Sequence, residues 1–303
     1  MSDTAFLFPG QGSQYVGMGK DLYEKSEFGK RIFNIANEML GYNFMKICFE
    51  GPEEKLKLTE NTQPALLTVS YILYNLLEQE PILCAGHSLG EYSAVLCAGG
   101  IKYEDAVMLV HKRGKYMQEA VPVGKGAMAA IIGLEIDQIR EKIEEINGIV
   151  NIANWNSSSQ IVISGEKESV RNAVEILDAP KSVMLPVSAP FHSTLMLPAE
   201  EELSIDLDNI EFKNLKFPII NNVDVEEIKD GDKVRDGLRR QVSRPVLWHQ
   251  TVLKMLNDKK IEKYAEIGAG KVLGGLVKRT ARNFDKKIEL INYQTIEDLN
   301  SSK

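Results

Sequence analysis

Short apolar runs alternate with amphipathic stretches along the first 120 residues. Residues 6–8 and 81–85 are apolar runs typical of buried strands, and helical spacing of apolar positions predicts helices near residues 20–40, 64–79 and 103–119. Strands that alternate with helices indicate a parallel sheet with helices on both faces. The first part of the chain therefore predicts an α/β fold.

The pattern changes between residues 124 and 190. It predicts a strand, a helix, two strands, a helix and a strand, at residues 127–132, 137–146, 149–153, 160–164, 167–177 and 182–187. This β-α-β-β-α-β order is that of a ferredoxin-like unit, and glycine or proline marks both of its ends. We expect residues 124–190 to form an inserted small subdomain, and residues 1–123 and 191–303 to form a large catalytic subdomain, with a cleft between the two.

The remaining chain returns to the large subdomain. We expect helices and strands to alternate again, with helices at residues 196–203, 231–243, 248–258 and 272–282 and strands at residues 217–220 and 264–267. Residues 268–271 read Gly-Ala-Gly-Lys, which resembles part of a phosphate-binding loop but lacks its full motif. We interpret this segment as the glycine-rich start of a helix.

Residues 86–90 read Gly-His-Ser-Leu-Gly and lie between a predicted strand and a helix-compatible stretch. A G-x-S-x-G sequence in that setting is typical of a nucleophile elbow, in which a sharp turn presents the serine. Gly86 and Gly90 lack the Cβ atoms that would collide in such a turn. The start of the following helix would place N–H groups where they stabilise an anion. Ser88 is the predicted nucleophile.

A serine nucleophile needs a base, and the chain has four histidines. His87 adjoins Ser88, where adjacent side chains diverge, so we expect it to pack or to shape the turn. His111 is expected on a polar helix face, and His249 at a helix cap or on the surface. His192 lies in the loop that leaves the small subdomain, and such loops commonly carry catalytic bases. It is the candidate base, with a buried structural histidine as the alternative.

Arg113 is a candidate for charge recognition. Its planar guanidinium can bind a carboxylate through two parallel hydrogen bonds, which lysine cannot match. Gly114 beside it has no side chain to crowd the guanidinium. From the sequence alone, a solvated basic helix face is nevertheless the favoured interpretation of Arg113.

The composition narrows the class of protein. The 303 residues are 44% hydrophobic and 26% charged, enough to bury a large core, and the net charge of −7 argues against general nucleic-acid binding. Cys48, Cys84 and Cys97 are an odd number without C-x-x-C spacing, which fits free thiols in a reducing compartment. No export signal, membrane-length apolar stretch or coiled-coil heptad is visible. We expect a cytoplasmic monomer with no membrane or nucleic-acid partner.

Several specific motifs follow one another over nearly the whole chain, at residues 6–14, 61–65, 86–94, 113–115, 117–120, 221–224 and 270–273. In these motifs the chain resembles the malonyl-CoA:acyl-carrier-protein transacylases of dissociated fatty-acid synthesis. The resemblance implies an α/β-hydrolase-like large subdomain with a parallel sheet and an inserted ferredoxin-like small subdomain. It also implies transfer of malonyl from malonyl-CoA to the phosphopantetheine thiol of acyl carrier protein, by a ping-pong reaction through a malonyl-serine, with no metal and no cofactor.

The resemblance assigns catalytic roles residue by residue. The family nucleophile falls on Ser88 and its histidine on His192. The carboxylate-binding arginine falls on Arg113, which reverses the interpretation as a solvated face. The backbone N–H groups of Gln11 and Leu89 are implied to form the oxyanion hole.

Further positions take supporting roles through the same resemblance. A backbone carbonyl orients the histidine in this family, and the matching residue is Gln241. Asn154 matches an asparagine of the small subdomain that faces the active site, and Gln63 is expected to bind substrate. Phe191 resembles the form that accompanies malonyl over methylmalonyl selection, because its ring leaves little room for an α-methyl group. Some bacterial members carry serine at that position.

Alternative functions and the partner surface stay open at this point. A serine esterase or thioesterase would use the same serine and histidine but would give the acyl group to water, and it normally needs an Asp or Glu partner for the histidine. A polyketide-pathway acyltransferase and a non-catalytic carrier-protein binder are further alternatives, although an intact serine and histidine argue against the binder.

An acidic carrier protein would need a basic face on this chain in order to dock. The candidate residues are Lys181, Lys271, Lys278, Arg279 and Arg282. The alternative is that these basic residues are scattered over the surface and only solvated.

Overall fold

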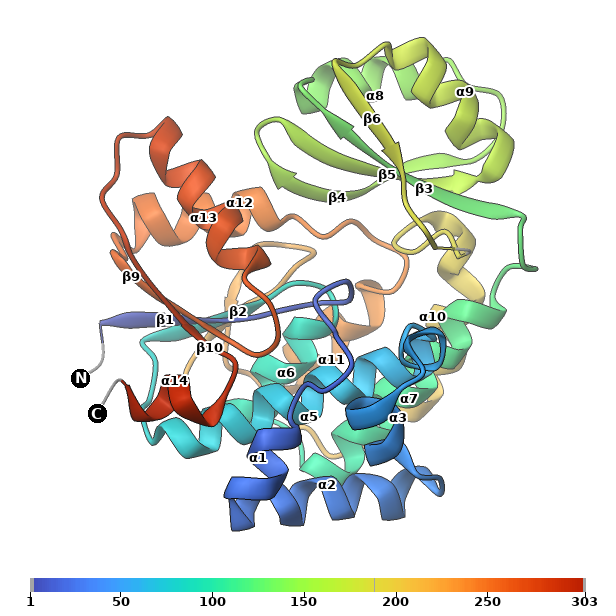
Figure 1. The fold of residues 1–303 in the computed structure, drawn as a ribbon. Coiled ribbons are helices and arrows are strands. Elements are labelled where there is room, and N and C mark those ends of the chain that lie inside the picture. The colour runs from blue at the N-terminus through green and yellow to red at the C-terminus, as the bar shows by residue number, and fades with distance from the viewer. Residues whose placement is uncertain (1–2, 188, 302–303) are drawn as a thin grey trace.

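The computed structural model describes residues 3–187 and 189–301, so Ser188 in the loop before His192 lies outside the described residues. Two separate sheets organise the chain, a six-stranded sheet in the order β10-β9-β1-β2-β7-β8 and a four-stranded sheet in the order β4-β5-β3-β6. In Figure 1 the smaller sheet and its two helices stand at the top of the view, above the larger sheet and the other helices. The predicted α/β class is confirmed.

The larger sheet is parallel except at one edge, where β8 runs antiparallel to β7. Side chains of its central strand alternate between two cores, since Phe6 and Phe8 join one cluster and Ala5 and Leu7 the other. Both faces are therefore buried, as predicted. The strands are β1 (Thr4–Phe8), β2 (Leu83–Gly86), β7 (Ile219–Ile220), β8 (Glu227–Ile228), β9 (Lys263–Ile267) and β10 (Glu289–Tyr293).

Helices cover both faces of this sheet. On the face of β1 that carries Phe6 and Phe8 pack α1 (Lys20–Lys25), α2 (Glu27–Leu40), α3 (Phe44–Glu50), α4 (Glu53–Leu56), α5 (Thr59–Leu77), α6 (Leu89–Cys97), α7 (Tyr103–Glu119), α10 (Leu197–Asp208), α11 (Gly231–Arg240) and α14 (Ile296–Asn300). The other face is covered by α12 (Trp248–Leu253), its π-helical continuation (Lys254–Asp258) and α13 (Val272–Asn283).

The smaller sheet has the predicted β-α-β-β-α-β order. Its elements are β3 (Gly126–Ile132), α8 (Ile136–Glu144), β4 (Val150–Ser157), β5 (Gln160–Glu166), α9 (Lys167–Leu177) and β6 (Lys181–Met184). All strand pairs are antiparallel. Ala129 and Ile131 of β3 pack in the cluster with α8 and α9, whereas Met128 and Ala130 belong to a cluster on the opposite face. Among the described residues, no member of this second cluster belongs to a helix.

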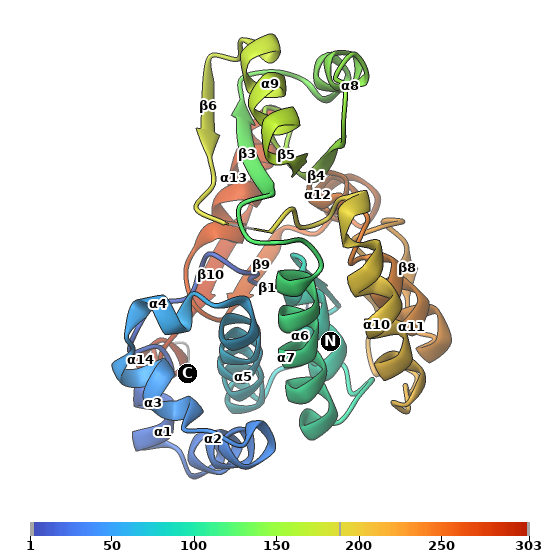
Figure 2. The same ribbon diagram turned by 90° about the vertical axis from the view of Figure 1, so that its right-hand side faces the viewer.

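Main-chain hydrogen bonds join the smaller sheet to the rest of the molecule. Trp155 N donates to Val246 O at 2.9 Å, and Val246 N donates to Ala153 O at 2.9 Å. Strand β4 therefore pairs with the segment just before α12, and both views show this strand next to that helix (Figures 1 and 2). Met128, on the face of the smaller sheet opposite α8 and α9, lines one pocket with Ser88, so this face lies over the carboxyl end of β2.

Several predicted helices have different bounds in the structure, among them two in the first 80 residues. The stretch at residues 20–40 is two helices, because Ser26 is extended and its side chain accepts from Gly29 N at 3.1 Å, capping α2. The helix predicted to start near residue 64 begins at Thr59, with Pro64 inside it.

Proline has no N–H to donate to the carbonyl four residues earlier, and His111 Nδ1 takes that carbonyl, Glu60 O, at 3.0 Å. His111 is partly buried in this contact.

Several short elements carried no sequence signal. Strand β10 lies at the edge of the larger sheet, and its first residues, Glu289 and Leu290, are exposed, so no apolar alternation marks it. Helices α3, α4 and α14 and strand β8 are likewise too short for a periodic pattern.

Candidate active site

Ser88 lies on a strained turn between β2 and α6. Its backbone has φ 52° and ψ −108°, a conformation that serine adopts only when the surrounding structure imposes it. A Cβ on Gly86 would lie 1.9 Å from the carbonyl carbon of Gly90, and a Cβ on Gly90 would lie 1.9 Å from Phe8 O. Only glycine fits at both positions, so the predicted strand–serine–helix turn is present.

Asn222 ties this turn to the strand beside it. Its Oδ1 accepts from Ser88 N at 2.8 Å, and its Nδ2 donates to Gly86 O at 2.7 Å. Asn222 follows β7, the parallel neighbour of β2, so the sheet itself holds the turn. The motif at residues 221–224 contains this residue, but nothing in the sequence pattern indicated its role.

His192 contacts the serine from a different part of the chain. Its Nε2 lies 2.8 Å from Ser88 Oγ, and its Nδ1 lies 2.8 Å from Gln241 O. Because a carbonyl oxygen only accepts, Nδ1 carries the proton and Nε2 accepts from the serine hydroxyl. Burial, together with the charge of Arg113, lowers the pKa of His192 to about 3. The imidazole is therefore neutral at pH 7 and can take the serine proton.

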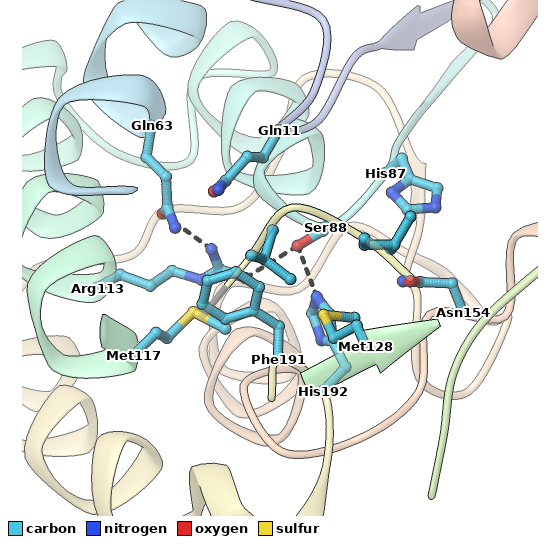
Figure 3. A pocket seen from close by; sticks show the side chains of 12 residues that line it. Gln11, Gln63, His87, Ser88, Arg113, Met117, Met128, Asn154, Phe191 and His192 are labelled. Carbon is cyan, nitrogen blue, oxygen red and sulfur yellow. Dashed lines mark hydrogen bonds between the residues drawn. The ribbon is translucent and has the colours of Figure 1, made fainter. Parts of the chain in front are cut away.

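Arg113 is 1% exposed, so the interpretation as a solvated helix face is wrong. Nη1 donates to Gln63 Oε1 at 2.8 Å, and Nη2 donates to Gln241 Oε1 at 3.0 Å and to Ser88 Oγ at 3.1 Å. The guanidinium carbon lies 5.0 Å from the centre of the Tyr92 ring. Figure 3 shows Arg113 and Gln63 pointing toward one another from two helices. A buried guanidinium with neutral partners suits the recognition of a carboxylate.

Gly114 has a different role from the one expected. A Cβ at this position would lie 2.6 Å from Thr59 O, so the glycine allows α7 to cross α5 closely. This close crossing brings Gln63 on α5 to Arg113 on α7.

The loop after β1 packs directly against the elbow. A Cβ on Gly10 would lie 2.4 Å from His87 O, and this closeness places Gln11 beside Ser88 (Figure 3). Leu89 is the first residue of α6, so its N–H has no acceptor within the helix. A backbone N–H group at this helix start is of the kind that stabilises an oxyanion.

The pocket above Ser88 has a polar side and an apolar side (Figure 3). Asn154, 8% exposed, reaches it from β4, and Phe191 reaches it from the loop before His192. Sequence reasoning missed the other apolar residues that line it, Met117, Met128, Leu185 and Val187. Met117 lies one helical turn beyond Arg113 and in the motif at residues 117–120, but neither feature was connected with a pocket.

The remaining histidines are structural. His87 Nε2 bonds Asn156 Oδ1 at 2.8 Å, which fits the expected shaping role. His249 is only 5% exposed and packs on Trp155 with ring centres 5.4 Å apart, so the expectation of a cap or surface role is wrong.

Helix α13 carries an exposed basic face and a closed amino-terminus. Lys278, Arg279 and Arg282 are exposed, and Arg279 Nη1 donates to Gln160 Oε1 at 2.9 Å. The buried carboxylate of Glu266 accepts from Leu273 N at 3.1 Å and Gly274 N at 2.8 Å. These first helical N–H groups are therefore occupied, and the glycine-rich loop before α13 does not offer them to a phosphate.

The described residues contain neither a candidate metal site nor a candidate membrane-spanning helix. Within residues 3–187 and 189–301, no group of three or more His, Cys, Asp or Glu side chains is placed to hold a metal ion. Over the same ranges, no helix has the length and apolar character needed to cross a membrane.

Comparison with known proteins gives consistent matches along the chain. Residues 5–297 match the family described as acyl transferase domain. The chain is 43% identical to the malonyl CoA-acyl carrier protein transacylase of Bacillus subtilis, over 98% of this chain and 96% of that one. It is 46% identical to the enzyme of the same name from Escherichia coli strain K12, over 92% and 93% of the two chains.

Solved structures agree with these matches. The crystal structure of an acyl carrier protein S-malonyltransferase from Vibrio cholerae superposes with a TM-score of 0.95 at 42% identity, covering 100% of both chains. A malonyl-transacylase solved in complex with a type II polyketide synthase acyl-carrier protein gives a TM-score of 0.94 at 40% identity, with 99% of each chain covered.

Proposed function

The chain belongs to the acyl transferase family, among the malonyl-CoA:acyl carrier protein transacylases, and on this basis we propose that it transfers malonyl by a ping-pong reaction through a malonyl ester of Ser88. Malonyl-CoA is the donor substrate and acyl carrier protein is the acceptor. The observation that carries the proposal is the contact of Ser88 Oγ with both His192 Nε2 and Arg113 Nη2. A nucleophile, a neutral base and a carboxylate-binding cation meet at one oxygen atom.

In the first half-reaction Ser88 Oγ attacks the thioester carbonyl carbon while His192 Nε2 takes the hydroxyl proton. The carbonyl oxygen becomes an oxyanion that the N–H groups of Gln11 and Leu89 stabilise. When the tetrahedral intermediate collapses, the C–S bond breaks and the proton on His192 passes to the sulfur of coenzyme A. The serine is left as a malonyl ester.

The second half-reaction reverses these steps with a different thiol. His192 takes the proton of the phosphopantetheine thiol, and the sulfur attacks the ester carbonyl. The C–O bond to Ser88 breaks, the serine recovers its proton, and malonyl leaves on acyl carrier protein.

Arg113 supplies the selection for malonyl in this proposal. Nη1 rests on the neutral side-chain oxygen of Gln63 and Nη2 on Ser88 Oγ, and a substrate carboxylate can replace these contacts with stronger, charge-assisted bonds. Phe191, with Met117 beside it in the pocket, would restrict the space around the α-carbon and so exclude a methyl branch. Asn154 faces the substrate from the smaller sheet.

The orientation of His192 separates this proposal from an esterase. A backbone carbonyl, that of Gln241, holds Nδ1 in place of the carboxylate that hydrolases normally use. We also propose that residues 124–190 act as a small subdomain over a catalytic subdomain of residues 1–123 and 191–303. The proposed setting is type II fatty acid synthesis by a monomer in the cytoplasm, in keeping with three buried free cysteines.

Initial-rate kinetics test the proposed reaction. Malonyl-CoA should be varied at several fixed concentrations of holo acyl carrier protein, with malonyl-carrier product measured by mass spectrometry. A ping-pong enzyme gives parallel double-reciprocal lines. Intersecting lines, or free malonate as the main product, would contradict the proposal.

A further inference from the structure

A buried carboxylate lies beneath the elbow and takes no part in the proposed chemistry. Glu91, in the first turn of α6, is 1% exposed. Its Oε2 accepts from Gln241 Nε2 at 2.7 Å and from Asn222 N at 3.0 Å. Burial raises the pKa of Glu91 to about 7. A carboxyl group is retained at such a depth only where its hydrogen bonds are well satisfied.

Arg113 presents the complementary situation. It is as deeply buried as Glu91, and the three oxygens that its Nη atoms bond, on Gln63, Gln241 and Ser88, are all neutral. A buried cation without a nearby counter-charge is costly.

The side-chain amide of Gln241 connects Glu91 to Arg113. Its Oε1 accepts from Arg113 Nη2, and its Nε2 donates to Glu91 Oε2. Since a carboxylate only accepts, Glu91 directs Nε2 toward itself and thereby directs Oε1 toward the guanidinium. The same Nε2 lies 3.0 Å from Ser88 O, so the amide is also in contact with the elbow.

We propose that Glu91 is a positioning residue for malonyl recognition: by fixing the Gln241 amide it aims the Arg113 guanidinium at the nucleophile. A carboxylate bonded directly to Arg113 would compete with the malonyl carboxylate for the same N–H groups. The intervening amide orients the guanidinium without occupying it with a charged partner. This inference rests on the proposed function, because it concerns the carboxylate of the malonyl group.

A purely structural role for Glu91 predicts a different outcome. Through Asn222 the carboxylate also supports the elbow, and weakening the elbow would slow the attack on every acyl donor equally. Acetyl-CoA has no carboxylate and does not use Arg113. The ratio of malonyl to acetyl loading therefore reports positioning of Arg113 and is insensitive to a general loss of stability.

The test measures loading of Ser88 by malonyl-CoA and by acetyl-CoA in the wild type, Glu91→Ala and Glu91→Gln. Loss of one charge-assisted hydrogen bond should lower the malonyl-to-acetyl ratio about tenfold in Glu91→Ala. Glu91→Gln keeps an acceptor oxygen, so its ratio should fall less, and this variant preserves the test if Glu91→Ala does not fold. An unchanged ratio in a folded Glu91→Gln enzyme, or equal losses with both donors, would overturn the inference.

A double-mutant cycle tests the connecting amide itself. Gln241→Met keeps the backbone carbonyl that holds His192 and removes only the amide, so it should lower the ratio by itself. Glu91→Ala should then cause no further fall in the ratio on the Gln241→Met background. If the two substitutions lower the malonyl-to-acetyl ratio independently, so that their effects multiply, Glu91 does not act through the Gln241 amide. A wild-type enzyme that takes no malonyl would instead mean that the proposed function has failed.

Discussion

The two sides of the pocket are built from different kinds of contact. On the nucleophile side, the backbone does most of the positioning: Gly86 and Gly90 allow the turn, and the carbonyl of Gln241 holds His192. On the carboxylate side, Arg113 is held by the side-chain oxygens of Gln63 and Gln241, at the close crossing of two helices.

This difference separates the residues that make Ser88 reactive from those that select the acyl donor. Backbone contacts around the serine and histidine cannot change without moving the sheet, and they act on any acyl donor. Side-chain contacts to the guanidinium can be exchanged for a substrate carboxylate at little cost to the fold. Changes on the nucleophile side should therefore affect all donors alike, and changes on the carboxylate side should alter the choice between donors.

The largest effect is expected from His192→Ala. Without a base, loading of Ser88 should fall about 10³-fold with malonyl-CoA and by a similar factor with acetyl-CoA. Rapid-quench loading assays with both donors measure this. A His249→Ala variant is the control, because His249 is also buried but packs on Trp155 away from the serine. A fall in the loading rate with only one of the two donors would contradict the claim that the nucleophile side acts on all donors alike.

The next effect is expected from Arg113→Ala. Removing the carboxylate partner should lower malonyl loading about 100-fold, since it removes a bidentate charged contact and the orientation that this contact provides. Acetyl loading should be unchanged or faster, because the pocket gains room and loses a charge. The two rates can be compared on the same preparation. Equal losses with both donors would show that Arg113 serves the nucleophile and not selection.

Electrostatic coupling between the two sides predicts a pH effect. A protonated His192 cannot act as a base, so loading falls as the pH drops through its pKa, which burial and then the charge of Arg113 lower to about 3. In Arg113→Gln the imidazolium loses a repelling charge, its pKa rises, and the acid limb should move up by about one pH unit. Acetyl-CoA is the suitable donor because it does not need Arg113. A limb that moves to lower pH would contradict the coupling.

The smallest effect is expected outside the pocket, on α13. Lys278→Glu with Arg282→Glu should raise the apparent KM for acyl carrier protein about threefold and leave that for malonyl-CoA unchanged, because an acidic partner is repelled only when it docks. Arg279 is left in place because it bonds Gln160. The control variant carries Lys20→Glu and Lys30→Glu, which reverse the charge of two exposed residues on α1 and α2, at the other end of the molecule (Figure 1). Equal changes in both pairs would remove α13 as a docking face.

The sequence predicted the fold well where apolar positions recur periodically or where a short motif requires glycine. The β-α-β-β-α-β order and the glycine turn around Ser88 were both readable, because alternation and the need for glycine are local properties. The edge strand β10 was missed because its exposed residues show no alternation.

The site was predicted less completely from its residues alone. Burial of Arg113 depends on how α5 crosses α7, a tertiary contact that a local helix pattern cannot contain, and only the family resemblance indicated it. The support from Asn222 and Glu91 was also invisible, because their partners lie more than 130 residues away along the chain. Distant hydrogen bonds of this kind leave no local pattern.

The most direct test of the central claim is the mass of the intact protein after brief mixing with malonyl-CoA, with Ser88→Ala as the control. The account predicts a malonyl adduct on the wild type that persists in water, is absent from Ser88→Ala, and is discharged when holo acyl carrier protein is added. Rapid loss of the adduct to water before carrier protein is added, or an equal adduct on Ser88→Ala, would contradict it.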